Sequence, residues 1–495
     1  MPAPRFLLAI DQGTTSTKVS VYDHRLTLKG SAGRELPQHF PGPGQVEHDL
    51  EDIWAGTVFC IGKALREAGV KGAESAGIGI TNQRETTGLW MREGGKPLHR
   101  ALVWQDRRTA DTCAALRARG EEDKVRKTTG LLLDPYFGAT KMSWLLEHVK
   151  GARAKAERGD AVFGTMDSWL VYNLTGGVAH VTDVTNASRT LLMGLSSLEW
   201  DASCLTRHEI SRAALPAIRS SSEVYGTTRG VKGLPDGIPV CGIAGDQQAA
   251  LFGQACFEPG ESKCTYGTGA FLLMNTGETS VPSSQGLLTT VAWQLKDQRA
   301  VYALEGSSFI AGAAVQWLRD GLKLIKKASD VEALATTVKD TGDVVFVPAL
   351  AGLGAPHWRP EARGLLAGMD RSTTAGHIAR AVLEGVALQL HDLAEAMRTD
   401  SGRGIPAFKV DGGAAANDLL MQFQADILQV PVVRPKDLQT TSLGAAALAG
   451  LGAGLFADTD AVKKVWRAEK TFKPRMKPEV RTRALAKWQR AIERA

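Results

Sequence analysis

The stretch "FLLAIDQGTTSTKVSVYDH", residues 6–24, decides the fold. A short apolar run leads into Asp-Gln-Gly-Thr-Thr-Ser-Thr, and an alternating apolar and polar run follows. This order predicts two strands joined by a tight turn. A plain hairpin turn needs little more than Asn-Gly or Asp-Gly. One carboxylate, one glycine and four hydroxyl residues, with Lys18 close behind, therefore indicate a turn that binds a ligand.

The second half of the chain repeats the plan of the first. Residues 262–276, "SKCTYGTGAFLLMNT", again read as strand, Gly/Thr turn and strand. A helix is expected after each hairpin, first in "HDLEDIWAGTVFCIGKALREAG", which Asp49 can cap and Gly69 ends, and again in "SFIAGAAVQWLRDGL". A further strand is expected after each helix. The repeat predicts two α/β domains of one ancestral fold, residues 1–253 and 254–495, flanking a catalytic cleft.

Two Thr-rich turns, one in each domain, can grip a polyphosphate from both sides of such a cleft. Their backbone amides and hydroxyls suit phosphate oxygens, and Gly13, Gly267 and Gly269 allow close approach. Asp11, at the end of the first strand, can hold Mg²⁺ through water. The sequence has no Walker loop. The arrangement resembles the phosphate clamp of the actin-like, or ribonuclease H-like, ATPase fold.

Composition excludes several classes of protein. The chain has 495 residues, of which 43% are hydrophobic, so large cores can be buried and disorder is excluded. Six scattered cysteines without Cys-x-x-Cys spacing predict free buried thiols in a reducing compartment. The N-terminus has no charged region followed by a long apolar run, so we expect no signal peptide. The run "SLGAAALAGLGAGLFA", residues 442–457, is too short to span a bilayer and predicts a tightly packed buried helix followed by a loop. We therefore expect no integral membrane segment. A cytoplasmic location follows.

The net charge of +6 is a property of the C-terminus. Residues 461–495 hold twelve Lys or Arg and three acids, so the rest of the chain is net negative. Leu485, Trp488 and Ile492 recur at helical spacing, which predicts a basic terminal helix over about 461–495 that docks through its apolar face. No stacking aromatics alternate with the charges, so nucleic-acid binding is not expected.

A candidate catalytic base lies in "GIAGDQQAALFG", where a strand meets the start of a helix. Asp246 could accept the proton of an alcohol, and Gln247 could bind a second hydroxyl. An Asp at a helix start can equally be a simple N-cap. Arg84 and Glu85 could likewise hold a small polyol or form an exposed ion pair. Further apolar walls for a three-carbon polyol could come from Trp104, Tyr136 and Phe271.

Motifs along essentially the whole chain resemble the glycerol kinases of the FGGY carbohydrate kinase family. The matching stretches include "AIDQGTTS", "GITNQRETT", "DPYF", "VTDVTNASRT", "GIAGDQQAALFGQ", "TYGTGAF", "YALEG", "GLGAPHW" and "DGGAAAND". The resemblance implies that ATP and glycerol give ADP and sn-glycerol 3-phosphate, with Mg²⁺ near Asp11 and Asp246. It implies glycerol binding by Arg84, Glu85, Trp104, Tyr136, Asp246, Gln247 and Phe271, with Asp246 as base. It implies nucleotide binding by Thr14, Thr15, Ser16, Lys18, Thr268, Gly312, Gln316, Gly413 and Asn417.

Two sequence features depart from the pattern of the family. Lys18 stands where the family commonly has Arg, which keeps the charge and loses the fork. Gly237 stands where relatives regulated by fructose 1,6-bisphosphate have an Arg, and no His lies between Tyr225 and Cys241 for regulation by phosphorylation. The resemblance also implies a homodimer or homotetramer, because relatives form both.

Two other functions stay open beside this one. The protein could be a kinase for another small polyol or ketose, or an actin-like or chaperone-like ATPase.

Overall fold

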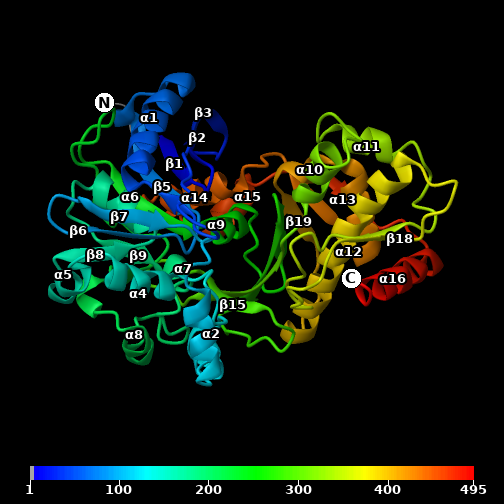
Figure 1. Ribbon diagram of the computed structural model, residues 1–495. Coiled ribbons are helices and arrows are strands. Elements are labelled where there is room, and N and C mark those ends of the chain that lie inside the picture. The colour runs from blue at the N-terminus through cyan, green and yellow to red at the C-terminus, as the bar shows by residue number, and fades with distance from the viewer. Residues whose placement is uncertain (1–4) are drawn as a thin grey trace.

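The computed structural model describes residues 5–495 and has two lobes, each built on one large mixed sheet (Figure 1). The sheet of the first lobe has the strand order β11-β12-β5-β1-β2-β3. Its strands are β1 (Phe6–Gln12), β2 (Ser16–Asp23), β3 (Leu28–Glu35), β5 (Ser75–Asn82), β11 (Gly226–Thr227) and β12 (Pro239–Gly245). The 19-residue helix α1 (Leu50–Ala68) begins after the Asp49 cap and ends at Gly69, as the sequence predicts.

A smaller region, built mostly from the chain between β5 and β12 together with residues 47–48, covers one end of this lobe. It contains a four-stranded sheet of order β4-β7-β6-β8 and a parallel pair, β9 with β10. The strands are β4 (Glu47–His48), β6 (Thr87–Met91), β7 (Pro97–Leu102), β8 (Ala161–Gly164), β9 (Val181–Asp183) and β10 (Ala217–Arg219). The helices of the lobe beyond α1 are η1 (Gly72–Glu74), α2 (Ala110–Ala118), α3 (Glu122–Thr129), α4 (Gly138–His148), α5 (Ala152–Arg158), α6 (Met166–Leu174), α7 (Val184–Ala187), α8 (Ala202–His208), η2 (Arg212–Ala214) and α9 (Asp246–Gly253).

The second lobe holds a seven-stranded sheet of order β15-β16-β14-β13-β19-β20-β21. Its strands are β13 (Ser262–Tyr266), β14 (Ala270–Gly277), β15 (Leu288–Trp293), β16 (Val301–Ser308), β19 (Phe408–Asp411), β20 (Val432–Pro435) and β21 (Ala468–Phe472), and β17 (Val345–Val347) pairs with β18 (Leu365–Ala367) outside it. Its helices are α10 (Gly312–Asp320), α11 (Asp330–Ala335), α12 (Ala375–Ser401), η3 (Gly413–Ala416), α13 (Asp418–Leu428), α14 (Thr440–Gly452), α15 (Thr459–Val465) and α16 (Pro478–Ile492).

The two large sheets share one core topology, to which the second sheet adds β15 beside β16. In the first, β1 pairs antiparallel with β2 and parallel with β5, and β5 pairs parallel with β12. In the second, β13 pairs antiparallel with β14 and parallel with β19, and β19 pairs parallel with β20. An antiparallel edge strand, β11 or β21, closes each series. This confirms the predicted duplicated α/β fold of the actin-like type.

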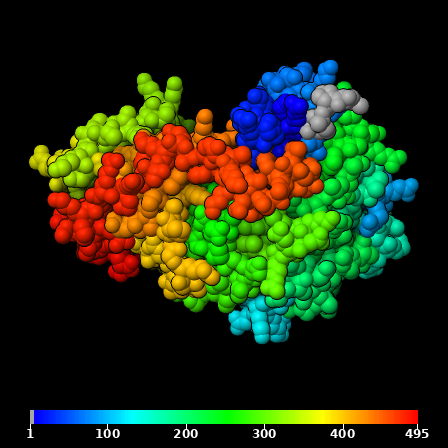
Figure 2. Space-filling view, turned by 180° about the vertical axis from the view of Figure 1, so that it is seen from behind, coloured from blue at the N-terminus to red at the C-terminus, as the bar shows by residue number. Residues whose placement is uncertain are grey.

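One helix from each repeat, α9 and α14, crosses between the lobes. Helix α14 belongs to the second repeat but packs on β1, β5 and β12 of the first sheet. Helix α9 packs against α14 and also contacts β13, β14 and β15 of the second sheet. Seen from behind, the orange part of the chain that includes α15 lies against the blue first strands (Figure 2). The lobes are therefore joined by two crossed helices as well as by the chain connection.

Small residues make this crossing possible. A β-carbon at Gly79 on β5 would overlap the carbonyl oxygen of Ala445 on α14. A β-carbon at Gly444 on α14 would overlap the carbonyl oxygen of Ala249 on α9. Glycine is required at both positions because backbone, which cannot move aside, lies where the side chain would be. The run over 442–457 is thus a buried helix followed by a loop, as predicted.

The C-terminal segment differs from the single basic helix predicted over 461–495. Helix α16 covers only 478–492, and the strand β21 precedes it as the edge of the second sheet. Pro474 and Pro478 interrupt any helix there, and Phe472 turns inward from the strand. The predicted docking face is confirmed, because Trp488 and Ile492 are buried in the core of the second lobe and Leu485 packs against it.

Two further expectations concern cysteines and membranes. All six cysteines are free and buried, as their spacing predicts. Within residues 5–495, no helix combines the length and the apolar character that crossing a bilayer requires.

Candidate active site

Three parallel strands of the first sheet end at one edge, and each delivers a predicted site residue. Asp11 is the last residue but one of β1, Arg84 follows β5, and Asp246 follows β12. Carboxyl ends of parallel strands share one edge of a sheet, and ligands of open α/β sheets bind there. The fold therefore brings together the predicted metal carboxylate, the predicted substrate cation and the predicted base.

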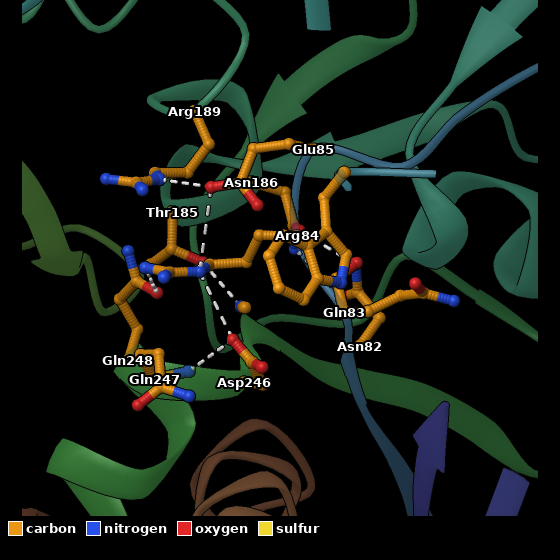
Figure 3. A network of polar contacts seen from close by, with 12 residues as sticks. Asn82, Gln83, Arg84, Glu85, Thr185, Asn186, Arg189, Asp246, Gln247 and Gln248 are labelled. Carbon is orange, nitrogen blue, oxygen red and sulfur yellow. Dashed lines mark hydrogen bonds and ion pairs between the residues drawn. The ribbon is translucent and has the colours of Figure 1, made fainter. Parts of the chain in front are cut away.

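Asp246 is the first residue of α9, and its carboxylate faces Arg84 (Figure 3). Oδ1 of Asp246 lies 3.2 Å from Nε of Arg84, and the Asp246 side chain is 34% exposed. The N-cap position of α9 belongs to Gly245, so the alternative that Asp246 is a simple N-cap is wrong. An accessible carboxylate beside a fixed cation is suited to accept a proton from a bound alcohol.

The backbone that leads into Asp246 is held by the segment around α7. The amide of Gly245 donates a hydrogen bond to Oγ1 of Thr185 at 2.9 Å. The Thr185 hydroxyl in turn donates to Asp183, which caps α7. Asn186 from the same helix bonds to Asn82 at the end of β5 (Figure 3). One short helix thus fixes the ends of two strands that deliver site residues.

Arg84 and Glu85 are buried, so the alternative of an exposed surface pair is wrong. Their side chains are 2% and 1% exposed, and Nε of Arg84 lies 3.8 Å from Oε1 of Glu85. Each has a closer partner elsewhere. Arg84 binds Glu305 with both terminal nitrogens, at 2.6 and 2.9 Å, and Glu85 accepts from Nε of Arg189 at 2.6 Å. The pair forms part of a buried charge network at the junction of the lobes.

Sequence reasoning did not single out Glu305 or Arg189 as site residues. Glu305 lies on β16 of the second lobe, and Arg189 lies just after α7. Both stand inside stretches that carry the family resemblance, "YALEG" and "VTDVTNASRT", and this was the only signal available. Burial would raise the pKa of Glu305, but Arg189 and Arg84 outweigh it and hold the pKa at about 2.

Trp104 and Tyr136 form one wall beside Arg84. Their rings meet edge to face with centroids 5.6 Å apart. The Tyr136 hydroxyl lies 3.5 Å from Nη2 of Arg84, and the Trp104 indole donates to Oγ1 of Thr14 at 2.8 Å. Burial raises the pKa of Tyr136, so its hydroxyl stays protonated. Trp104 thereby links the predicted acceptor pocket to the predicted phosphate loop.

Of the two remaining predicted substrate residues, Gln247 contacts the second lobe and Phe271 belongs to it. The side-chain oxygen of Gln247 accepts a hydrogen bond from the buried Lys263 on β13. Burial lowers the pKa of Lys263. Phe271 on β14 is half-buried against the apolar cluster between the lobes. Among the aromatic ring pairs of residues 5–495, Trp104 pairs with Tyr136 and Phe271 pairs with neither of them.

The surroundings of Asp11 suit a carboxylate that binds a cation. It pairs across the hairpin with Lys18 and accepts a hydrogen bond from Ser442 on α14 at 3.3 Å. Burial, and next the charge of Asp246, raise the pKa of Asp11 to about 6, while Lys18 opposes the shift. Within residues 5–495, no group of three or more His, Cys, Asp or Glu side chains could enclose a metal. Two carboxylates without further protein ligands fit Mg²⁺, which keeps water and binds substrate phosphates.

The first phosphate loop is a closed turn between β1 and β2. The amide of Gly13 donates to the carbonyl of Ser16 at 2.9 Å. Thr15 is exposed at the tip, and Thr14 and Ser16 are half-buried on either side. The loop therefore presents hydroxyls to the surface beside Asp11.

The second loop brings Thr268 and Gly312 together. The amides of Ala311 and Ala313, at the start of α10, both donate to the carbonyl of Thr268, and the amide of Gly312 donates to Gly267. A β-carbon at Gly312 would lie 2.6 Å from the Gly267 carbonyl, so this close approach requires glycine. Gln316 is exposed one turn further along α10. The predicted nucleotide residues of this region thus share one surface.

Gly413 and Asn417 lie on the turn that follows β19. Gly413 is exposed, and a β-carbon there would meet no atom within 4 Å. Oδ1 of Asn417 accepts from the amide of Leu420 at 2.8 Å and caps α13. The side-chain oxygen of Asn417 is therefore engaged in the cap, and its amide nitrogen is the group left to meet a ligand.

The whole chain is similar to known carbohydrate kinases. Residues 6–253 match the N-terminal domain, and residues 262–453 the C-terminal domain, of the FGGY family of carbohydrate kinases. A glycerol kinase from Myxococcus xanthus is 68% identical over 496 residues and covers all of both chains. A glycerol kinase from Deinococcus radiodurans is 54% identical, over 100% of this chain and 98% of that protein.

A solved structure of similar fold is the glycerol kinase of Plasmodium falciparum with ADP. It superposes with a TM-score of 0.93 at 38% identity, over 99% of this chain and 98% of that one. Full-length matches to the family and to several of its members agree with the duplicated fold. The chain belongs to the FGGY family of carbohydrate kinases.

Proposed function

We propose that this protein is an ATP-dependent glycerol kinase that produces sn-glycerol 3-phosphate and ADP. The observation that carries the proposal is the meeting of Arg84, Glu85 and Asp246 at one sheet edge, in a chain whose full-length relatives are glycerol kinases. A fork of donors beside two carboxylates can hold adjacent hydroxyls and accept a proton from one of them.

In this proposal Asp246 is the general base. The substrate lies against Trp104 and Tyr136, with its hydroxyls held by Arg84 and Glu85. Asp246 accepts the proton of the hydroxyl that attacks the γ-phosphorus. As the new O–P bond forms, the bond between the γ-phosphorus and the β,γ-bridging oxygen breaks, and that oxygen leaves with ADP. Gln247 binds a further hydroxyl through its amide nitrogen, and Phe271 closes the carbon side when the lobes approach each other.

The nucleotide is proposed to lie between the two phosphate loops. Thr14, Thr15, Ser16 and Lys18 would bind its phosphates from the first lobe. The second-lobe residues of the proposed nucleotide site are Thr268, Gly312, Gln316, Gly413 and Asn417. ADP in the Plasmodium relative supports ATP as the co-substrate. Lys18 is the cation closest along the chain to the Thr-rich turn, and as a point charge it suits a phosphate without requiring a fork.

Asp11 and Asp246 are the proposed ligands of Mg²⁺. Burial, and next the repulsion from Asp246, raise the pKa of Asp11, and a divalent cation bound between the two carboxylates would relieve that repulsion. When bound, Mg²⁺ offsets the charge of the β- and γ-phosphate oxygens. Ser442 orients Asp11 for this role.

The remaining proposals concern organisation. We divide the chain into a glycerol-side domain, 1–253, and a nucleotide-side domain, 254–495, with α9 ending at the boundary. We place the enzyme in the cytoplasm as a homodimer or homotetramer. Buried free thiols and the requirement for ATP support the location.

The decisive experiment is ADP release from magnesium ATP with and without glycerol, with glycerol 3-phosphate measured in parallel. Strong dependence on glycerol, with the two products formed in equal amounts, is the expected result. Equal ADP release without glycerol would instead favour an actin-like or chaperone-like ATPase. If erythritol or a ketopentose outcompeted glycerol at equal concentration, the enzyme would be a kinase for that substrate.

A further inference from the structure

Four buried side chains form a closed ring of ion pairs behind the acceptor site. Glu305 binds Nη1 and Nη2 of Arg84 at 2.6 and 2.9 Å and Nη2 of Arg189 at 3.2 Å. Arg189 binds Glu85 at 2.6 Å, and the Arg84–Glu85 distance of 3.8 Å closes the ring. Every member is at most 2% exposed. Two guanidiniums and two carboxylates leave the ring without net charge.

The ring divides into an inner and an outer pair. Arg84 also reaches the accessible carboxylate of Asp246 with its Nε, so it forms the side of the ring that meets the proposed base (Figure 3). Glu85 follows Arg84 in the chain and is the second member of the ring that is proposed to contact the substrate. Arg189 and Glu305 lie on the far side and bond to Arg84 and Glu85 through fixed planar geometry. Glu305 does so from the second lobe, on β16.

Backbone strain shows that Glu85 is held in place. Its φ of 61° lies in the left-handed region, which costs a non-glycine residue of order 1–3 kcal/mol and persists only where neighbours over-determine it. The bond from Arg189 and the hydrogen bond from Thr87 to the Glu85 carbonyl are the contacts that fix it. Without Arg189 the carboxylate of Glu85 would lose the partner that orients it.

Burial makes the outer pair necessary. A buried Arg84 or Glu85 without a counter-ion would be strongly disfavoured in its charged form. The ring neutralises both while leaving the Nε edge of Arg84 directed at Asp246. Arg189 also lies over the Tyr136 ring, with its guanidinium carbon 5.5 Å from the ring centre. The outer pair therefore touches three of the proposed glycerol contacts.

We propose that Arg189 and Glu305 are positioning residues of the acceptor site, which hold Arg84 and Glu85 in the geometry that selects glycerol. The inference rests on the proposed function. Because Glu305 comes from the second lobe, the acceptor site is complete only when the two lobes are in register at β16. Neither residue is placed in contact with the reacting atoms.

The test compares Glu305→Gln, Arg189→Lys and wild type. Loss of one charge-assisted hydrogen bond should raise the KM for glycerol about tenfold to hundredfold, with the KM for ATP changed by less than about threefold. Arg189→Lys keeps the charge and loses the fork, so it should show a smaller rise. The control is Glu384→Gln, which breaks the 2.9 Å pair with Arg380 on α12, outside the cleft, and should leave both KM values unchanged.

A coupling measurement separates positioning from mere structural support. Inhibition constants of 1,2-propanediol and 1,3-propanediol, each lacking one hydroxyl of glycerol, are measured for every variant. If Glu305 positions Arg84 and Glu85, the penalty for the missing hydroxyl shrinks in Glu305→Gln, because the contact is already impaired. If the ring is only structural, the missing hydroxyl weakens binding by the same factor in Glu305→Gln as in wild type. The melting temperature then falls without a selective loss of glycerol binding.

Several outcomes would overturn the inference. A folded Glu305→Gln enzyme with glycerol KM within about twofold of wild type would do so, as would equal rises in both KM values. If Glu305→Gln does not fold, Arg189→Lys and Glu305→Asp carry the same coupling test. If wild type shows no glycerol-dependent ADP release, the proposed function fails, while calorimetric binding of glycerol to wild type and variants still decides whether the ring positions a polyol.

Discussion

Nε of Arg84 lies 3.2 Å from Oδ1 of Asp246, and this contact joins the end of β5 to the start of α9. The same guanidinium binds Glu305 of the second lobe through its other two nitrogens. One side chain therefore connects the proposed base, the first sheet and the second sheet.

Asp246→Asn should remove most turnover without unfolding the protein. The amide cannot accept the proton of the attacking hydroxyl, so kcat should fall by roughly 10²- to 10⁴-fold. The side chain is partly exposed, so the melting temperature should change little. Steady-state kinetics and thermal unfolding of the purified variant measure both. Turnover near the wild-type rate would show that Asp246 is not the base.

Asp11→Asn should make the metal-free protein more stable and the enzyme less active. Burial and the charge of Asp246 disfavour the ionised Asp11, so a neutral amide relieves a cost that the metal-free fold carries. The same change removes a proposed ligand of Mg²⁺, so half-maximal activity should need at least about tenfold more magnesium. Thermal unfolding with EDTA and a magnesium titration of activity check the two effects. A lower melting temperature with an unchanged magnesium requirement would contradict the assignment.

Trp104→Phe should weaken the binding of ATP. The change keeps the aromatic wall and removes the 2.8 Å hydrogen bond to Thr14 of the phosphate loop. The KM for ATP should rise roughly threefold to tenfold, which corresponds to one lost hydrogen bond. Trp144→Phe on α4, where the ring stacks on His148, is the matched control. An ATP dependence equal to that of the control would show that the Trp104–Thr14 bond does not support the loop.

Gly79→Ala should destabilise the junction of the lobes. The added methyl group would overlap the Ala445 carbonyl, so α14 must move off the first sheet. Overpacking of this kind costs about 1–3 kcal/mol or more. Gly404→Ala, where a β-carbon meets no atom within 4 Å, is the control. Urea unfolding compares them, and a shared midpoint would mean that α14 does not pack on β5 as described.

Protonation of His208 should contribute to acid unfolding. Burial, and next the charge of Arg207, lower its folded pKa from 6.5 to about 4. The unfolded chain therefore binds the proton more readily, so this stability is complete above about pH 6.5 and is lost as the pH falls through 4. Relative to neutral pH, the loss at about pH 5 is about 2 kcal/mol. His208→Leu should flatten the unfolding free energy between these pH values, and an unchanged slope would contradict the assignment.

Sequence patterns predicted the elements that depend on neighbours along the chain. The two Thr-rich hairpins, the capped helix α1 and the buried helix of residues 442–457 follow from turn chemistry, caps and periodicity. The face of α16 that carries Trp488 and Ile492 was predicted in the same way. The length of that terminal helix was not, because β21 owes its existence to pairing with β20.

For the site, the sequence alone named Asp11, Arg84 and Asp246, because each carries a charged side chain where an apolar strand ends. Only the tertiary structure decided that Arg84 and Glu85 are buried, that Arg189 and Glu305 neutralise them, and that α14 crosses to the first sheet. The physical reason is that strand, turn and cap preferences are recorded within a few residues. The partner of a buried charge, and the surface on which a small-residue helix packs, are set by contacts between segments that come together only on folding.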